Sequence, residues 1–588
     1  MPLDKKATSL IILVVAAVMI GLLLYYITPV MGEGVYRGAL HIGCDGEEEV
    51  VLFNFTIGKG SKAVAKTERV RVCGVETYVK LSVPEVDGVK LARTFNVGVL
   101  LNASGVDYER VRLRLVLVSP GGYSFAYVPL SFDKVRGEAK FTIKTLYRTK
   151  EAAFIFGSAV ILFIGSSIIP FVVTSIYLTL ALYLAGAITL AEPFTLYMSD
   201  TCLVFLAGSA LELVIKNTGL GMRIASALRS LAESPSSLFL STMLIGGFIS
   251  MWMSNTSATY LLLPIVASLA SGAGIEDTKL YELVLAGLAV GTTIGGSATL
   301  VGTPPNLIAG GYLNTNVYSA HVITFSNWVM WGLPYFALSA VIAYVTFLLM
   351  YRVAGAREAE VVRARLKRFV AAHEGGARWS RGEVLGLVGI LFLVGMWVTE
   401  SIHGIKTGVA GMLGLLVFLT LGVLKAKDIK SLGWDIVILM GGGLTLGRGL
   451  VDTGFSDALV QLFTPYMVAP TVLIWLVGLS SLMLGTFMSS HTAGVAFLCP
   501  IVAPVGYVIG PALGLKPESG AALVVILSTL ALDTAVALPI STPPSAIVFG
   551  TGKVRIKTLL LYGMLFGIVT VALTLYLLPP LIIYALPR

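Results

Sequence analysis

Charged residues are scarce in this sequence. Only 13% of its 588 residues are Asp, Glu, Lys or Arg, whereas soluble domains carry roughly 25%. Apolar residues make up 56% of the chain and give a mean hydropathy of +0.86. The deficit excludes an ordinary soluble protein and predicts that most of the chain lies in lipid. The net charge of +9 should then reflect membrane topology, and we expect no nucleic-acid partner.

The motifs of common enzyme classes are also missing. The sequence contains no glycine-rich nucleotide fingerprint, no zinc-binding spacing among its four cysteines and no serine-hydrolase elbow. No second soluble stretch is long enough to form an enzyme domain. We therefore expect a membrane protein that is not an enzyme.

Long apolar runs are what the sequence has instead. Many reach the roughly 20 residues that cross a bilayer, and they predict an α-helical polytopic protein of the plasma membrane. We divide the chain into a first span at 1–31, a β-rich insert at 32–147, helical regions at 148–351 and 384–588, and a basic cytoplasmic loop at 352–383. The positive-inside rule predicts a cytoplasmic N-terminus and an extracytoplasmic C-terminus.

The insert at 32–147 has a different pattern. Stretches such as "EEEVVLFNFTIG" and "RVRLRLVLVSP" alternate apolar and polar residues and are rich in β-branched side chains, as strands are. We expect an extracytoplasmic domain resembling a β-sandwich, a location that glycosylation sequons at Asn54 and Asn102 favour. Cys44 and Cys73 could form a disulfide there or remain two buried thiols.

The helical part contains a duplicated unit. "SNTSATYLLLPIVASLA" from Ser254 matches "SHTAGVAFLCPIVAPVG" from Ser490, and "GTPPNLIAGG" matches "STPPSAIVFG". Asp200 corresponds to Asp435 and Thr303 to Thr542, so that the offset stays between 235 and 239 residues. We place the two copies at about 198–316 and 433–555. The basic loops predict that they are inverted repeats, each with a re-entrant hairpin and a broken helix.

The paired motifs predict an anion-binding site. Backbone inside a bilayer must satisfy its own hydrogen bonds, so hairpin tips and Pro-Pro breaks persist only where they line a cavity or hold a ligand. Amides freed at helix N-termini attract an anion, whereas freed carbonyls and hydroxyls coordinate a cation. Two half-sites related by a pseudo-twofold axis would enclose an anion with two negative ends.

At these residues the sequence resembles the divalent anion:sodium symporter family, which carries dicarboxylates, citrate or sulfate. The hallmarks are Ser254-Asn255-Thr256, Ser490-His491-Thr492, "GTPPN" and "STPPS". The resemblance covers the first span and about 150–588, but not the β-rich insert. It implies eleven spans and two re-entrant hairpins in a homodimer that works by an elevator-type mechanism.

The resemblance also implies site residues. Those that would contact the substrate are Ser254, Asn255, Thr256, Thr303, Ser490, His491, Thr492, Thr542 and Pro543. A first sodium ion would be held by Ser250, Ser254, Asn255 and Gly302. A second would be held by Thr486, Ser489, Ser541 and the residue at 491.

One departure from the family pattern puts the second sodium ion in doubt. Position 491 is His, where the family usually has Asn, and imidazole is a poor ligand for a hard cation. Protonated His491 could replace that cation, or neutral His491 could leave sodium bound through other oxygens. Asp533 is a candidate partner of His491 in proton coupling. Glu212 and Lys216, one turn apart, are expected to form a structural ion pair.

We therefore predict a secondary transporter of small divalent anions, C4 dicarboxylates or citrate, coupled to one or two sodium ions. One alternative is a proton-coupled carrier or an exchanger in which His491 replaces a sodium ion. Another is the related branch of arsenite carriers and sodium/proton antiporters, against which the doubled Ser-x-Thr tips argue. A third is an anion sensor with an extracellular β domain and no transport.

Overall fold

The computed structural model describes most of the chain, with short gaps. The described residues are 5–27, 34–44, 47–57, 63–72, 75–83, 94–102, 111–118, 124–127, 131–133, 138–144, 149–165, 168–352, 362–368, 378–456 and 469–586. Eight helices among them are long and apolar enough to cross a membrane. The predicted basic loop at 352–383 falls largely outside the described residues, as do Cys73 and the side chain of Cys44.

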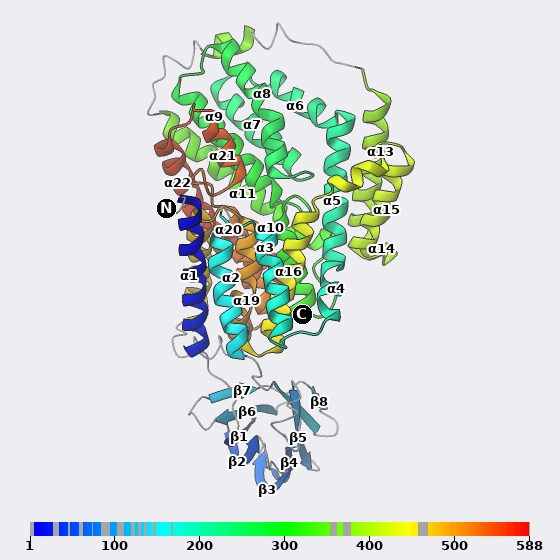
Figure 1. Ribbon diagram of the computed structural model, residues 1–588, viewed down its shortest axis with the longest axis vertical. Helices are drawn as coiled ribbons and strands as arrows, with labels where there is room; N and C mark the ends of the chain where they lie inside the picture. Colours follow the sequence, from blue (N-terminus) through cyan, green and yellow to red (C-terminus); the bar gives the residue numbers. More distant parts are fainter. Residues whose placement is uncertain are drawn as a thin grey trace.

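Helices make up one body of the molecule and strands the other (Figure 1). The helices of the first half are α1 (Lys5–Ile27), α2 (Thr149–Ile164), α3 (Phe171–Leu184), α4 (Ala191–Tyr197), α5 (Asp200–Thr218), α6 (Leu220–Leu231), α7 (Pro235–Ser250), α8 (Asn255–Ala273), α9 (Lys279–Gly296), α10 (Pro304–Tyr312), η2 (Leu313–Val317) and α11 (Phe325–Arg352). Those of the second half are α13 (Arg381–Val398), α14 (Glu400–His403), α15 (Thr407–Thr420), η3 (Ala426–Ser431), α16 (Trp434–Asp452), α18 (Pro470–Phe487), α19 (His491–Ile509), η5 (Pro511–Leu513), α20 (Pro517–Asp533), α21 (Pro543–Gly550), α22 (Ile556–Leu577) and α23 (Pro579–Ala585).

The strands lie between α1 and α2 and form two antiparallel sheets at one end of the molecule (Figure 1). One sheet has the order β2 (Glu47–Ile57), β1 (Gly34–Cys44), β6 (Arg112–Val118), β7 (Ser124–Tyr127). The other has the order β3 (Val64–Val72), β4 (Val75–Val83), β5 (Thr94–Asn102), β9 (Glu138–Lys144), β8 (Ser131–Asp133). Alternate residues are buried, such as Leu40 and Ile42 in β1 and Val97 and Val99 in β5. The side of the membrane on which the sheets lie stays a prediction.

The two motif pairs coincide with interruptions of helices. The chain leaves helical structure between α7 and α8 at 251–254 and between α9 and α10 at 297–303. It does so again between α18 and α19 at 488–490 and between α20 and α21 at 534–542. Both Pro-Pro pairs open the helix that follows, because proline fits the first turn, where no amide donor is needed.

One long apolar run divides into two helices, α5 and α6. The run at 201–229 is interrupted by Gly219, whose φ of 85° places it in the left-handed region. That conformation ends a helix, and glycine adopts it without steric cost. Gly454, its counterpart in the second copy, follows α16 with a φ of 73°.

Close packing of α7 against α9 depends on glycine. A Cβ atom on Gly291 would lie 2.7 Å from the Cα of Met243, and one on Gly295 would lie 2.6 Å from the carbonyl carbon of Gly247. Both obstacles are backbone, which cannot rotate away. Small residues permit such approach in membrane helix pairs, and this contact fixes α9 beside α7 and α8.

Gly291→Ala is expected to lower the thermal midpoint of the detergent-solubilised protein, because the added methyl group must separate α7 from α9. The loss should correspond to about 1–3 kcal/mol of overpacking. Gly395→Ala in α13 is the matched control, because a Cβ there meets nothing within 4 Å. Equal midpoints for the two variants would contradict this account of the helix contact.

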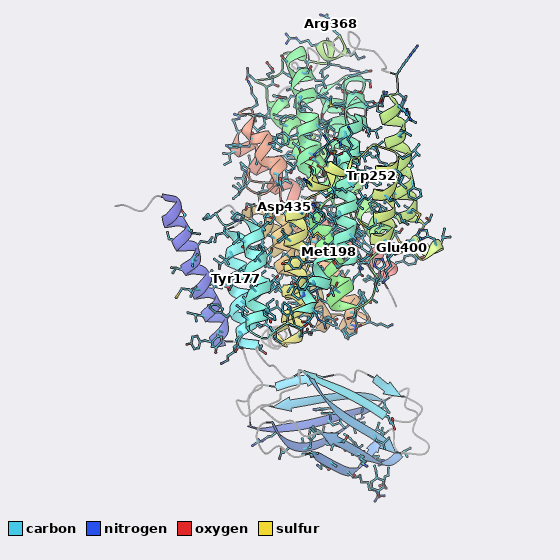
Figure 2. All side chains as sticks on the ribbon, turned by 45° about the vertical axis from the view of Figure 1, so that its right-hand side comes forward. Tyr177, Met198, Trp252, Arg368, Glu400 and Asp435 are labelled. Carbon is cyan, nitrogen blue, oxygen red and sulfur yellow. The ribbon has the colours of Figure 1, made fainter. Side chains whose placement is uncertain are left out.

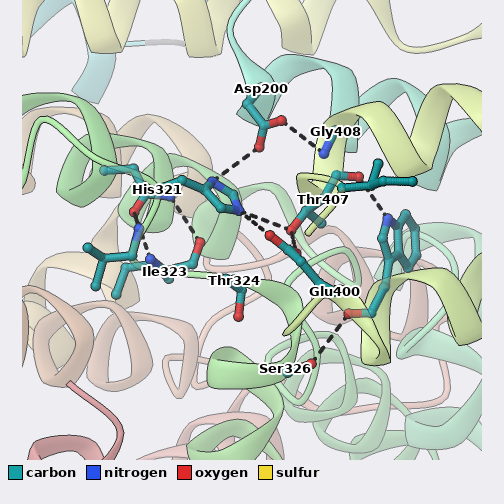
Figure 3. A network of polar contacts seen from close by, with 12 residues as sticks. Asp200, His321, Ile323, Thr324, Ser326, Glu400, Thr407 and Gly408 are labelled. Carbon is teal, nitrogen blue, oxygen red and sulfur yellow. Dashed lines mark hydrogen bonds and ion pairs between the residues drawn. The ribbon is translucent and has the colours of Figure 1, made fainter. Parts of the chain in front are cut away.

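A polar network joins four distant segments (Figure 3). His321, just before α11, has Nε2 2.7 Å from Glu400 Oε1 and Nδ1 3.5 Å from Asp200 Oδ2. The Thr407 hydroxyl donates to Glu400, and the Gly408 amide donates to the other oxygen of Asp200 at 3.0 Å. The hydrogen bond to Glu400 raises the pKa of His321 above its ordinary value. Burial alone would raise the pKa of Glu400, but hydrogen bonds from His321 and Thr407 lower it overall.

These shifts predict a pH-dependent stability. Because the pKa of His321 is raised, its contribution is complete below about pH 6.5 and is lost as the pH rises through the raised value. On the acid side, the contribution of Glu400 is lost only as the pH falls through its lowered pKa. The thermal midpoint should therefore decline as the pH rises above about 6.5, and His321→Gln should flatten that decline.

His403→Gln is the control for this experiment, because the ring nitrogens of His403 contact backbone groups at Met396 and Ile405. Midpoints should be recorded for the native protein and both variants in the same detergent and buffers. The same slope in the native protein and in His321→Gln would show that the network does not set the pH response.

Candidate functional site

The two Ser-x-Thr motifs, at 254–256 (the first tip) and 490–492 (the second tip), line one cavity of about 560 Å³. The two Pro-Pro motifs, which begin at Thr303 (the first break) and Thr542 (the second break), line the same cavity. All nine residues predicted to contact substrate line it: Ser254, Asn255, Thr256, Thr303, Ser490, His491, Thr492, Thr542 and Pro543. Gly302 and Ser489 from the predicted cation sets also line it, whereas Ser250, Thr486, Ser541 and Asp533 do not. The remaining walls come largely from α5 and from residues 431–436.

Four helix N-termini open toward this cavity. Ser254 caps α8 and Ser490 caps α19, each by accepting a hydrogen bond from the backbone amide three residues on. Thr542 caps α21 in the same way, and Thr303 precedes α10. Each N-terminus carries a partial positive charge, worth about 0.3–1 kcal/mol to a nearby anion. The arrangement therefore suits a ligand with more than one negative group.

The first predicted cation set consists of oxygen atoms around Gly302. The Ser250 hydroxyl donates to Asn255 Oδ1 at 2.7 Å. A Cβ on Gly302 would lie 2.9 Å from the Ser250 carbonyl oxygen, and one on Gly296 would lie 3.0 Å from Cγ of Asn255. Glycine at these positions keeps a small cradle open among carbonyl and amide oxygens. Such a donor set fits a hard cation like sodium.

Asn306 was not among the predicted residues, yet it belongs to this cradle. Its amide nitrogen donates to the carbonyl oxygens of Gly296 and Thr299 at 3.1 and 2.7 Å. Its Oδ1 is buried without a hydrogen-bond partner among the described residues. Burying an oxygen without a partner costs free energy, and a cation bound to this oxygen would remove that cost. The signal was present in the sequence, since Asn306 ends the quoted "GTPPN".

The second predicted set differs in just these features. Ser541 stands where the first copy has Gly302, and its hydroxyl donates to the Thr486 carbonyl oxygen at 2.8 Å. Thr486 Oγ1 in turn donates to Leu482 at 2.8 Å. Two of the predicted ligands therefore bond to one another or to their own helix. His491 adds nitrogen where the first copy has the amide oxygen of Asn255.

His491 and Asp533, far apart in the sequence, lie side by side. His491 Nδ1 is 3.5 Å from Asp533 Oδ1, and their side chains are 9% and 3% exposed. The other Asp533 oxygen accepts from the Ser297 hydroxyl at 2.8 Å, which links the second break to the first. His491 Nε2 is buried and has no hydrogen-bond partner among the described residues. The imidazole thus lines the cavity with one ring nitrogen uncommitted.

Glu212 has more contacts than the expected ion pair. Lys216 Nζ is 2.6 Å from Glu212 Oε1, as the one-turn spacing predicted. The carboxylate also accepts from the Ser254 amide at 3.0 Å, from the Ser254 hydroxyl at 3.2 Å and from the Ser257 hydroxyl at 2.6 Å. Both Glu212 and Lys216 line the cavity. The predicted ion pair is confirmed, and the carboxylate adds tertiary contacts that a local pairing does not reveal.

Comparison with known proteins places this site in context. The model of the citrate transporter family, CitMHS, matches residues 152–505 and 394–588. A sodium-dependent dicarboxylate transporter, SdcS, of Staphylococcus saprophyticus is 29% identical over 452 residues, which cover 70% of this chain and 83% of that protein. An uncharacterized transporter of Haemophilus influenzae is 29% identical over 413 residues, covering 68% and 85% of the two chains.

Among solved structures, the YdaH transporter of Alcanivorax borkumensis, described as having an unusual topology, matches with a TM-score of 0.41 and 15% identity. That match covers 67% of this chain and 89% of the other. The family match spans most of the helical region, and the resemblance to divalent anion:sodium symporters is confirmed. The chain belongs to the citrate transporter family and is a multi-pass membrane transporter, not an enzyme.

Proposed function

We propose that this protein is a cation-coupled secondary transporter of small divalent anions, C4 dicarboxylates or citrate. The observation that carries the proposal is the meeting of four helix N-termini, two from each half, at one cavity. A dianion would place one negative end at each tip. Thr256 and Thr492, which line the cavity beside the two tips, would offer hydroxyl donors to those ends.

The first oxygen cradle supports sodium as a coupling ion. Ser250, Asn255, Asn306 and the backbone around Gly302 would hold it, and a bound cation would supply positive charge next to the substrate. The name of the SdcS relative agrees with sodium dependence. The second set has no equivalent cradle, because the Ser541 hydroxyl bonds to the Thr486 carbonyl. We therefore propose at most one conventional sodium site.

The orientation in a plasma membrane follows from charge. Arg368, in the predicted basic loop, lies at the end of the helical body that is farthest from the sheets (Figure 2). Since basic loops favour the cytoplasm, the sheets would be extracytoplasmic, the N-terminus cytoplasmic and the C-terminus extracytoplasmic. The proposal also includes inverted repeats with re-entrant hairpins and an elevator motion. The protein would work as a homodimer, and the molar mass of the detergent-solubilised protein tests this.

Counterflow of labelled succinate, citrate and sulfate in proteoliposomes tests the function. Native protein should accumulate at least one of them, whereas a sensor would bind the anion without accumulating it. Thr256→Phe and Thr492→Phe should each lower uptake at least about tenfold, since a bulky ring fills the cavity at a helix N-terminus. Thr420→Phe, at an exposed position of α15, is the control. Unchanged uptake in both cavity variants would refute the site.

His491 favours a second candidate, in which a proton replaces the second cation. Imidazole changes its charge between about pH 5 and 8, and a bound dianion favours the charged form. Asp533 lies 3.5 Å from Nδ1, so that Nε2 is the ring nitrogen left to donate to the substrate. Protonation and substrate binding would strengthen one another, and this coupling is reciprocal.

Substrate affinity should therefore rise by roughly fivefold or more as the pH falls from about 8 to 6. The dissociation constant of fumarate, which stays doubly ionised in this range, is the quantity to measure at several sodium concentrations. His491→Asn should flatten the pH response and steepen the sodium dependence, because asparagine restores an amide oxygen. A native protein with steep multi-sodium dependence and no pH effect would leave His491 as a neutral substitute for asparagine.

A further inference from the structure

Glu212 places a carboxylate at the first tip. Its Oε2 accepts from the Ser254 amide at 3.0 Å, and its Oε1 accepts from the Ser254 and Ser257 hydroxyls at 3.2 and 2.6 Å. These donors form the N-terminal turn of α8. The carboxylate therefore occupies the kind of position that a helix N-terminus offers to an anion. Ser254 is also one of the residues proposed to bind the substrate.

The second tip lacks this feature. In the repeat that pairs Asp200 with Asp435, the counterpart of Glu212 is Gly447, which has no side chain. A Cβ on Gly447 would lie 2.6 Å from the ring of Tyr312, so an acidic residue would not fit there. The second tip instead presents His491, with Asp533 behind it. The two tips thus share the Ser-x-Thr motif and differ in the side chains beside them.

Lys216 completes the first tip. Its Nζ lies 2.6 Å from Glu212 Oε1, and its side chain is 43% exposed and lines the cavity. A substrate carboxylate that took the place of Glu212 would find the same donors and the same ammonium group. The exchange would leave every donor paired, because one carboxylate replaces another.

We propose that Glu212 is a tethered competitor of the substrate. It occupies the first tip when the cavity holds no anion, and one carboxylate of an arriving dianion displaces it onto the cavity wall. Because Glu212 is covalently held nearby, its effective concentration is high, and it lowers the apparent affinity for substrate. It also sets charge selectivity, since an anion without a second carboxylate gains less from displacing it. The inference rests on the proposed function.

Equilibrium binding of labelled succinate to purified full-length protein tests this, with succinamate as a competitor that has one carboxylate fewer at nearly the same size. Glu212→Gln should tighten succinate binding by roughly tenfold. Because electrostatic energy scales with ligand charge, the gain for succinamate should be roughly the square root of that factor. A carboxylate that only holds the first tip in shape would give unchanged or weaker succinate binding when it is neutralised.

Ser257→Ala is the second variant, because it removes a donor to Glu212 without touching a residue that lines the cavity. It should tighten succinate binding in the same direction by a smaller factor. Asp452→Asn is the matched control. Asp452 forms a one-turn ion pair with Arg448 at 3.0 Å on α16, the helix that corresponds to α5. Neither residue lines the cavity. It should leave both dissociation constants unchanged.

The outcomes separate the two proposals. Native binding of succinate with unchanged or weaker binding in Glu212→Gln and Ser257→Ala would overturn the competitor role and leave the proposed function intact. If the native protein and both variants all fail to bind succinate, citrate and sulfate, the proposed function and this inference are both overturned. If Glu212→Gln does not fold, the direction of the Ser257→Ala shift decides.

Discussion

Unpaired backbone groups at interrupted helices are the constraint on which the rest of this structure depends. Each helix that stops and restarts leaves amides at one end and carbonyls at the other without intrahelical partners, and lipid offers nothing to replace them. The chain meets this demand by gathering four N-termini at one cavity, where hydroxyl caps from Ser254, Ser490 and Thr542 satisfy part of the need. The other amides of these first helical turns can donate to an anion in the cavity.

The two halves solve the same problem with different side chains. In the first, glycine at 302 leaves carbonyl oxygens open, and Asn255 and Asn306 add amide oxygens. In the second, the Ser541 hydroxyl bonds to the corresponding carbonyl, and His491 replaces the amide. A duplicated backbone thus supports one oxygen cradle and one titratable group. The asymmetry lies in a few side chains, so that each change can be reversed by a single substitution.

Much of this site could be predicted from the sequence, because the signals are local. Proline and glycine fix backbone geometry, and the register of "GTPPN" with "STPPS" marks both breaks in the sequence itself. The nine substrate-contacting residues that the family resemblance implied all line the cavity. Tertiary contacts were different. Glu212 has a suitable partner one turn away, which concealed its bonds to Ser254 and Ser257, and the distance between His491 and Asp533 depends on how α19 and α20 pack.

The network around His321 escaped prediction for a related reason. Its members come from four segments, and none stands in a motif that singles it out. Asp200 does belong to the repeat, where its counterpart Asp435 is also the acidic residue of a first helical turn. At α5 that residue faces a histidine and the amide of Gly408. Asp200 thus makes a tertiary contact, as Glu212 does further along the same helix. The helix α5 therefore makes one carboxylate contact through its first residue, to the segment before α11, and another through Glu212, to the first tip, and both contacts fix its position.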